Sequence, residues 1–271
     1  MGEKTMLRAA VLSQERIADQ IYSMWLSAEP IARVARPGQF VSVYSNDTGR
    51  LLPRPISICE TDKGRGALRL VYRIAGRGTA EFAGRRAGET LELLGPLGNG
   101  FPPERCPEGK TAFLIGGGIG LPPMAELSKQ IRGKVQVIAG YRDELFLTEE
   151  LAANGKLFLS AESEALVASY TRDHGQGSIT HGNVLDCIRE NQLQADVIYA
   201  CGPTPMLRAV KAFALEHNIE CWLSLEERMA CGIGACLACV CESTEIDTHS
   251  QVKNKRICKE GPVFAAEEIV L

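Results

Sequence analysis

Residues Phe113–Pro123 read FLIGGGIGLPP, and their pattern sets the architecture of the middle of the chain. The leading apolar residues suit a buried strand, and the glycines that follow allow a tight turn whose backbone can approach a pyrophosphate closely. Pro122 or Pro123 suits the first turn of a helix, where no N–H donor is needed. Leucine or proline stands where the strict G-x-G-x-x-G fingerprint has its last glycine. A dinucleotide-binding turn and a plain strand-to-helix turn are therefore both open interpretations.

The chain on either side of this turn alternates apolar runs with segments of helical period. Such alternation is typical of an α/β domain in which helices cover a parallel sheet. We therefore predict a Rossmann-like α/β domain over residues 104–222. Its expected strands are TAFLI, VQVIA, KLFLS, DVIYAC and ECWLSL, and its expected helices lie near 123–132, 143–153, 183–192 and 204–217.

A second glycine turn, with the sequence CGPTPM, follows another buried strand and opens another helix. Two such turns in one domain favour dinucleotide binding over a plain turn. The candidate binding residues are Gly117, Gly118, Gly120, Cys201 and Gly202.

The residues after strand VQVIAG leave the choice of dinucleotide open. Arg142 could accept the 2′-phosphate of NADPH, whereas Asp143 could hold the ribose diol of NADH. The sequence alone therefore fits either cofactor.

Residues 1–103 show a different pattern, in which short β-rich runs are separated by turns. The runs recur at roughly the 8–12-residue spacing of a closed barrel or a sandwich. Pro37-Gly38 and Lys63–Gly66 supply two of the turns. We predict an antiparallel β-barrel domain with the strands LRAAVL, IYSMWLSA, QFVSVYS, RPISICE, ALRLVYRI and ETLELLG.

Two motifs in this β-rich part have the chemistry to bind a flavin nucleotide. The first is RPIS, in which an arginine can bind a pyrophosphate as a fork and a serine can reach a flavin ring nitrogen. The second is a glycine-rich turn, GRGTAEF, which opens a helix whose N-terminal amides would receive a phosphate. Alone, RPIS also fits an edge strand with a surface arginine. The candidate flavin-binding residues are Arg54, Pro55, Ile56, Ser57, Val71, Tyr72, Arg73, Gly78 and Thr79.

Near the C-terminus, CGIGACLAC places Cys231, Cys236 and Cys239 at the C-x4-C-x2-C spacing of plant-type [2Fe–2S] sites. Small residues between the cysteines let the backbone wrap a cluster and aim amide N–H groups at its sulfurs. Zinc sites usually have two C-x2-C pairs, and only one is present. A disulfide scaffold would need a secretory chain. We therefore predict a [2Fe–2S] module over residues 223–271.

The fourth cluster ligand has two candidates. Cys241 lies two residues after Cys239, whereas Cys258 lies in RICKEGP, a predicted strand and turn that would return a thiol to the loop. A residue so close to a neighbouring ligand usually points away from the cluster. The sequence therefore favours Cys258, with Cys241 as a buried neighbour.

The bulk properties exclude several classes of protein. The 271 residues carry 30 basic and 33 acidic side chains, a formal charge of −3, which gives no electrostatic basis for binding nucleic acid. No apolar run approaches the length of a membrane span. Ten cysteines without a signal peptide indicate a reducing compartment, so we expect a cytoplasmic protein. None of the histidines (His174, His181, His217 and His249) lies in a motif above, so we expect no catalytic acid or base.

The motifs RPIS, G-x-G-T and GPLGNGF together resemble the flavin domain of the ferredoxin–NADP reductase superfamily. That resemblance implies FAD, with Arg54 and Thr79 at its pyrophosphate, Ser57 near the isoalloxazine, and Tyr72 beside the ring or the ribityl chain. The glycine turns resemble the nicotinamide domains of the same superfamily. By that resemblance, Gly118 and Gly120 lie at the dinucleotide, and Cys201 and Gly202 lie beside the nicotinamide.

The order of flavin, nicotinamide and cluster modules resembles one family along essentially the whole chain, the electron-transfer subunits of type 1B dihydroorotate dehydrogenase. The resemblance implies a partner, a separate FMN-containing catalytic subunit that oxidises dihydroorotate in pyrimidine synthesis. Electrons would pass through the [2Fe–2S] cluster and FAD to NAD+, in a heterotetramer of two plus two subunits.

Two other interpretations are open. One is a flavin and [2Fe–2S] subunit of an NADH-dependent ferredoxin:NADP oxidoreductase or a sulfhydrogenase-type complex, whose domains are similar. The other is an accessory or regulatory protein that keeps the fold but has lost a cofactor. The intact glycine turns and cysteines argue against the second.

Overall fold

The computed structural model describes residues 4–47, 49–246 and 251–271. The chain divides into two compact units. The first combines Met1–Phe101 with Leu225–Val270, and the second comprises Pro102–Ser224 together with Leu271. The cysteine-rich C-terminal segment therefore belongs to the same unit as the β-rich N-terminal part.

The N-terminal part is a closed antiparallel barrel, which confirms the predicted fold class. Its strands follow one another around the barrel in the order β1-β2-β5-β4-β3-β6, so β4, with the RPIS motif, lies between β5 and β3. The strands are β1 (Thr5–Ala18), β2 (Ile21–Ser27), β3 (Phe40–Tyr44), β4 (Arg54–Asp62), β5 (Ala67–Arg73) and β6 (Thr90–Leu97).

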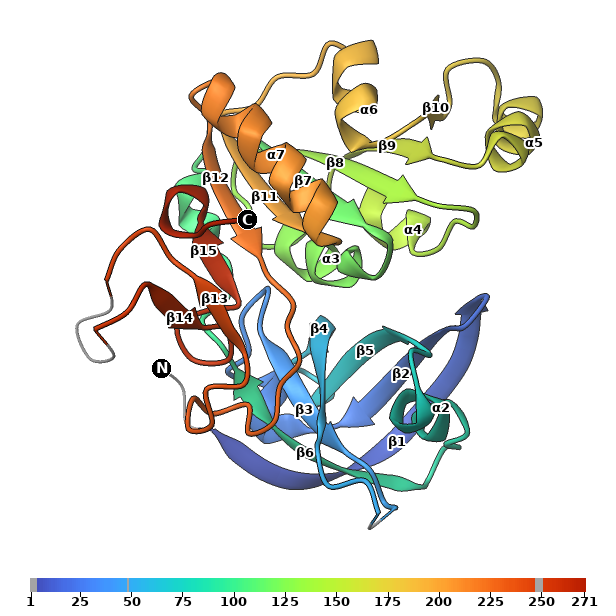
Figure 1. Cartoon of the computed structure of the whole chain (residues 1–271). Helices are drawn as coiled ribbons and strands as arrows, with labels where there is room; N and C mark the ends of the chain where they lie inside the picture. Colours follow the sequence, from blue (N-terminus) through green and yellow to red (C-terminus); the bar gives the residue numbers. More distant parts are fainter. Residues whose placement is uncertain (1–3, 48, 247–250) are drawn as a thin grey trace. The chain divides into compact units, whose positions relative to one another are not determined.

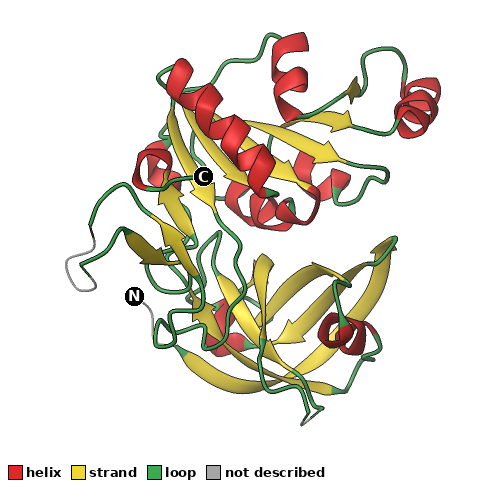
Figure 2. Cartoon of the chain, viewed as in Figure 1, coloured by secondary structure: helices red, strands yellow, loops and turns green. Residues whose placement is uncertain are grey.

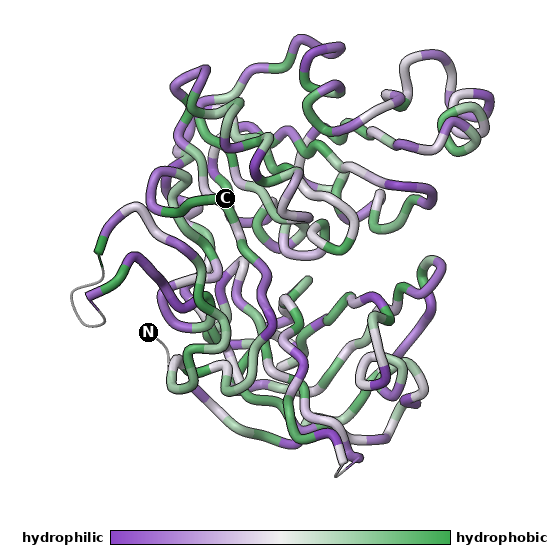
Figure 3. The backbone as a smooth tube through the Cα atoms, in the orientation of Figure 1, coloured by the Kyte–Doolittle hydropathy of each residue, from purple (hydrophilic) through white to green (hydrophobic). Residues whose placement is uncertain are grey.

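The barrel closes around alternate residues of its strands. Val41, Val43 and Ile56 belong to one buried core cluster with Leu91 and Leu93, and the residues between them point to the outer face. Figure 3 shows hydrophilic and hydrophobic residues interleaved along these strands. The alternation of side chains along these strands therefore builds the core of the barrel.

Two short helices accompany the barrel, α1 (Glu29–Ala32) and α2 (Arg77–Ala83). The sequence predicts α2, because GRGTAEF has a glycine turn at its start. The Thr79 side chain accepts hydrogen bonds from the backbone N–H groups of Ala75 (2.9 Å) and Gly76 (3.3 Å). This capping fixes the turn that leads from β5 into the helix.

The second unit is built on a parallel sheet, as predicted, with strands in the order β10-β9-β8-β7-β11-β12. Figures 1 and 2 show the helices of this unit against its sheet. The strands are β7 (Thr111–Gly117), β8 (Lys134–Tyr141), β9 (Lys156–Ala161), β10 (Thr180–His181), β11 (Val197–Cys201) and β12 (Glu220–Ser224). The helices are α3 (Pro122–Ser128), α4 (Thr148–Ala152), α5 (Glu164–His174), α6 (Val184–Glu190) and α7 (Thr204–Glu216), with the 3-10 turns η1 (Pro103–Arg105) and η2 (Gly118–Gly120).

The helices of this unit differ from the prediction in two places. The expected helix over 143–153 is helical only in α4, because Leu147 adopts the left-handed conformation (φ 58°) just before it. Helix α5 was not predicted, and none of its residues is buried, so it lacks the apolar stripe by which a helix is recognised.

The C-terminal segment forms short elements around the cysteines. Strands β13 (Val240–Glu242) and β14 (Asn254–Arg256) form an antiparallel pair, and a turn follows β14, as the sequence RICKEGP predicts. Strand β15 (Val263–Ala265) and the 3-10 turn η3 (Ala266–Glu268) complete the segment. Among the described residues, no helix is long and apolar enough to span a membrane.

Candidate functional site

The two predicted flavin motifs meet in the barrel unit. Arg54 begins β4 and Gly78 lies in the first turn of α2, 24 residues further along the chain. A Cβ atom built on Gly78 would stand 2.5 Å from Nε of Arg54 and 2.8 Å from its Cζ. The guanidinium therefore lies directly on the helix turn at Gly78. A cation beside the first turn of a helix is an arrangement that suits a pyrophosphate.

The rest of RPIS lies along the β3–β4 ladder. Pro55 pairs with Ser42 and Ser57 pairs with Phe40, while Ile56 is buried in the barrel core. Pro55 and Ser57 are half-buried, so both keep some surface on the outer face of the barrel.

Tyr72 is 3% exposed and packs within the barrel core. Its hydroxyl donates to Oε1 of Gln14 (2.9 Å), and its ring stacks on Tyr22 and meets Phe82 of α2 edge-on. Burial, with Tyr22 nearby, raises the pKa of Tyr72. Its flanking residues differ, since Val71 is buried and Arg73 is exposed. A place for Tyr72 beside a flavin stays a prediction.

Gln14 of β1 is a residue that the sequence reasoning missed. Its amide donates to the carbonyl oxygens of Phe82 (2.9 Å), Ala83 (2.9 Å) and Arg85 (3.0 Å) at the end of α2. The same side chain accepts from Tyr72. Gln14 therefore ties β5 to α2, and a single glutamine in a long strand gives no sequence signal for this.

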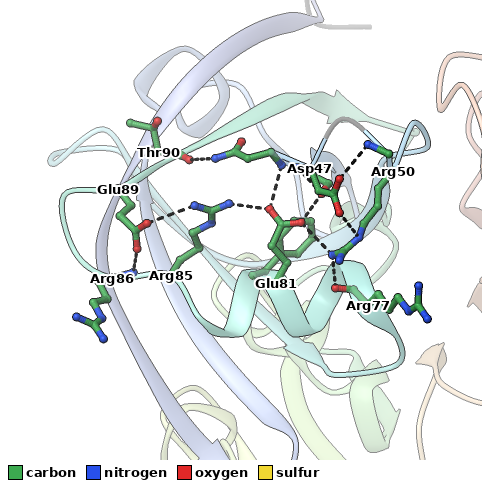
Figure 4. A network of polar contacts seen from close by, with 12 residues as sticks. Asp47, Arg50, Arg77, Glu81, Arg85, Arg86, Glu89 and Thr90 are labelled. Carbon is green, nitrogen blue, oxygen red and sulfur yellow. Dashed lines mark hydrogen bonds and ion pairs between the residues drawn. The ribbon is translucent and has the colours of Figure 1, made fainter.

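An ionic network centred on Glu81 holds α2 against the loop that precedes β4 (Figure 4). Arg85 donates to Oε1 of Glu81 (2.6 Å), and Arg50 donates to Oε2 (3.2 Å). Arg50 also donates to the backbone oxygen of Arg77 (2.7 Å) at the helix start. The turn that carries Gly78 is thus fixed from both ends by charge, which the sequence did not reveal.

The network changes the acidity of Glu81. Burial acts to raise the pKa of Glu81, but hydrogen bonds from Ser45, Asn46 and Arg85, with the charge of Arg85, outweigh it. The pKa of Glu81 therefore lies below its ordinary value of 4.5. The carboxylate is the form that the network stabilises.

The second unit brings its two glycine turns together at the carboxyl ends of β7 and β11. A Cβ atom on Gly120 would fall on the carbonyl of Cys201, and one on Gly202 would stand 3.1 Å from the amide nitrogen of Gly117. A Cβ on Gly117 would meet the sulfur of Met206 at 2.6 Å. Each turn is therefore shaped by the backbone of the other. Ligands of open α/β sheets bind at this end of the strands.

Gly118 differs from its neighbours, because no atom lies within 4 Å of a Cβ built on it and its φ is +53°. Its backbone is therefore open, in a conformation that favours glycine. Arg142 and Asp143 follow β8, and both are exposed. Their exposure therefore does not distinguish between NADH and NADPH as the dinucleotide.

In the barrel unit, the segment Cys231–Cys239, named here the cluster loop, arranges amides around sulfur. Sγ of Cys231 accepts from the backbone N–H groups of Ile233 (3.5 Å) and Ala235 (3.3 Å). Burial acts to raise the pKa of Cys231, but these hydrogen bonds and those from Cys236 outweigh it and lower the pKa to about 6. A thiolate is the form that binds iron.

Cys258 meets the cluster loop, whereas Cys241 does not. The backbone N–H of Cys258 donates to Sγ of Cys239 (3.4 Å), and both residues are buried. The thiol of Cys241 instead donates to the carbonyl of Lys255 (3.5 Å) across the β13–β14 pair. Cys236 is exposed. Among the described residues, no group of three or more His, Cys, Asp or Glu side chains is arranged for a metal ion.

Arg256 supports the cluster loop and was also missed. It donates to the carbonyl of Gly234 (3.1 Å) and forms an ion pair with Glu260 (2.6 Å). Lys259 packs on the same glycine, 2.8 Å from where its Cβ would be. Two side chains, Arg256 at the end of β14 and Lys259 in the turn after it, thus support the cluster loop at Gly234, and neither belongs to a recognisable sequence motif.

The described histidines interact with backbone oxygens. Ring nitrogens of His174, His181 and His217 lie 3.1, 3.3 and 2.9 Å from the carbonyls of Tyr170, Glu162 and Phe213. His249 lies outside the described residues.

Comparisons with known proteins give consistent findings. Residues 226–270 match the family model of the iron-sulfur cluster binding domain of dihydroorotate dehydrogenase B. The "Dihydroorotate dehydrogenase B (NAD(+)), electron transfer subunit" of Bacillus caldolyticus is 44% identical over 97% of this chain and 98% of its own length. The subunit of that name from Listeria monocytogenes serotype 4a is 43% identical over 96% and 97%.

Solved structures share the fold. An NADH-dependent reduced ferredoxin-NADP oxidoreductase structure has a TM-score of 0.80 at 24% identity, covering 97% of this chain and 89% of its own. A ferredoxin NADP+ reductase from Neisseria gonorrhoeae with bound FAD and NADP has a TM-score of 0.61 at 18% identity, covering 78% and 91%. The match to the second structure includes a smaller share of this chain and a slightly larger share of the solved chain.

Proposed function

This chain belongs to the family of dihydroorotate dehydrogenase B electron transfer subunits, and we propose that it passes electrons from a catalytic subunit to NAD+ through a [2Fe–2S] cluster and FAD. The proposed source is dihydroorotate, oxidised at the FMN of that separate subunit during pyrimidine (UMP) synthesis. The observation that carries the proposal is the 44% identity over 97% of the chain, which extends from the barrel through the cluster loop.

The barrel residues fit FAD. Arg54 would bind the pyrophosphate together with the turn at Gly78 and Thr79, since the guanidinium already lies on that turn. Ser57, with Pro55 and Ile56 beside it on β4, would orient the isoalloxazine, and the strand end Val71–Arg73 would flank it. Bound flavin can exchange electrons singly or in pairs, which is the chemistry needed between a cluster and a nicotinamide.

The cysteines fit a [2Fe–2S] cluster held by Cys231, Cys236, Cys239 and Cys258. Amide donors already point at Sγ of Cys231 and Cys239, as they do around cluster sulfurs. Cys241 is turned to Lys255 and would stay outside the ligand set.

The glycine turns of the second unit fit NAD+. Gly117, Gly118 and Gly120 would let the dinucleotide approach the backbone after β7. Cys201 and Gly202, which shape that turn from β11, would lie beside the nicotinamide. No side chain here is assigned as an acid or base, because the residues of the two glycine turns position a cofactor.

Membership of the same family supports a proposal for the partner and the setting. We propose an assembly with an FMN-containing catalytic subunit, two copies of each, in the cytoplasm. The three functional parts, residues 1–103, 104–222 and 223–271, would bind FAD, NAD+ and the cluster respectively. The first and third share one compact unit, which suits electron transfer over a short path.

The deciding experiment is dihydroorotate-dependent reduction of NAD+, measured anaerobically with and without the catalytic subunit. We expect activity in the mixture alone, and we expect Cys258→Ser to abolish it while Cys241→Ser preserves it. A preparation that carries FAD and a cluster and is bleached by NADH, yet fails in the mixture, would instead support a ferredoxin-linked oxidoreductase. The fold similarity to such an enzyme makes that the relevant alternative.

A further inference from the structure

Ser42 is a fully buried serine on the outer face of the barrel. Val41 and Val43 point into the barrel core, so the side chain of Ser42 between them points away from it. Outward positions normally face water, but Ser42 is 0% exposed. A Cβ atom on Gly232, the residue after Cys231, would stand 2.8 Å from Oγ of Ser42. The cluster loop therefore covers this hydroxyl.

The hydroxyl of Ser42 has lost water without gaining a protein partner. Its Oγ forms no hydrogen bond within the described part of the chain. Buried hydroxyls in folded proteins are almost always paired, because an unpaired one forfeits its hydration. The hydrogen-bond partner of Ser42 is therefore expected to belong to a group that the cluster loop binds.

We propose that Ser42 donates a hydrogen bond to a sulfur of the [2Fe–2S] site at Cys231, and that it is a positioning residue that raises the cluster potential. The inference rests on the proposed cluster. A donor at sulfur stabilises the reduced cluster, which carries one more negative charge than the oxidised one. Removing the donor therefore favours the oxidised form.

Ser42 also lies next to the strand that carries the flavin motif. Ser42 pairs with Pro55 of β4, the strand that also carries Arg54 and Ser57. One serine thus contacts the cluster loop and the strand of the flavin motif. The hydroxyl would therefore act on the cluster from β3, next to the strand that carries the flavin motif.

The test is Ser42→Ala in the full chain, with iron and sulfide content and the midpoint potential measured by an EPR-monitored titration. Ser160→Ala is the matched control, because Ser160 is also 0% exposed with an unpaired Oγ, on β9 of the other unit. We expect Ser42→Ala to keep the cluster and shift its potential to more negative values. We expect Ser160→Ala to leave the potential unchanged.

Pulsed EPR of the reduced cluster after exchange into D2O gives an independent readout. We expect one exchangeable proton coupling of the unaltered chain to be lost in Ser42→Ala. A full cluster with unchanged potential and coupling would overturn the proposal. Should Ser42→Ala lose its cluster, Ser42→Thr decides: a cluster with the original potential supports the hydroxyl's role, and its loss overturns it. Absence of iron from the unaltered chain would instead refute the proposed function.

Discussion

The two units build their candidate sites from different materials. In the second unit the glycine turns after β7 and β11 fit backbone against backbone, with Gly120 against the Cys201 carbonyl. In the barrel unit the candidate sites are built from side chains. Arg54 lies on Gly78, Glu81 holds α2 through ion pairs, and Sγ of Cys231 accepts hydrogen bonds from backbone amides. The backbone site should therefore respond to an atom added where the two turns touch, and the side-chain sites to changes of chemical group.

The largest effect is expected at the cluster loop, where replacing one sulfur atom by oxygen changes the chemistry of a side chain and little else. Cys258→Ser should remove the cluster, because its hydroxyl is a poor substitute for a thiolate ligand. Cys241→Ser is the matched control and should retain iron, sulfide and the visible spectrum. The reverse result would exchange the roles of the two cysteines.

The next effect tests the backbone site. Gly120→Ala should lower the free energy of unfolding by about 1–3 kcal/mol and weaken NADH binding at least about tenfold, because its methyl group overlaps the Cys201 carbonyl. Thermal unfolding and NADH titration measure both. Gly118→Ala is the control for the unfolding measurement only, since its space is open and the strain of its positive φ should cost only about 1 kcal/mol. Equal losses in the two variants would contradict the steric account.

A side-chain deletion in the barrel should act on ligand binding more than on folding. Arg54→Ala removes the guanidinium from the Gly78 turn, and loss of a charge-assisted contact of about 1.5–3 kcal/mol should weaken FAD retention by roughly 10- to 100-fold. Flavin content after gel filtration measures this. Arg33→Ala, which breaks an exposed pair with Glu29, is the control and should leave flavin content unchanged. Full occupancy in Arg54→Ala would remove Arg54 from the site.

The smallest effect depends on pH. Because the pKa of Glu81 is lower in the folded protein than its ordinary value of 4.5, its stabilisation is present above that value and is lost as the pH falls through the folded pKa. Glu81→Gln should therefore cost about 1–2 kcal/mol at pH 7 and flatten the acid limb of the stability curve below pH 4.5. Glu92→Gln, at an exposed pair with Arg8, should change neither. An unaltered acid limb in Glu81→Gln would show that the network is not stabilising.

Periodicity accounts for how much of the fold could be predicted. The β-rich runs at regular spacing, and the apolar runs that alternate with segments of helical period, made the type and order of these elements visible in the chain. Helix α5 lies on the surface with no buried residue and escaped prediction. The expected helix over 143–153 shortened to α4, because Leu147 turns left-handed for a reason that its residue type does not signal.

The candidate sites divide in the same way. Glycine spacing and the C-x4-C-x2-C run point to binding turns and thiols because that chemistry requires particular residues at short, fixed separations. Gln14, Arg256 and the Glu81 network had no such signal. Their contacts join residues far apart in the chain, and a common polar side chain looks the same whether or not it supports a site.

By itself, the sequence determined the kinds of strands, the turns that can approach a phosphate, and the cysteines that can bind iron, because these depend on local spacing and residue chemistry. Tertiary structure alone decided that Arg54 lies on Gly78, that the backbone N–H of Cys258 donates to Sγ of Cys239, and that the cluster loop covers Ser42. These contacts depend on how the barrel closes and the C-terminal segment returns to it. That closure is set by the packing of the whole unit and by no single motif.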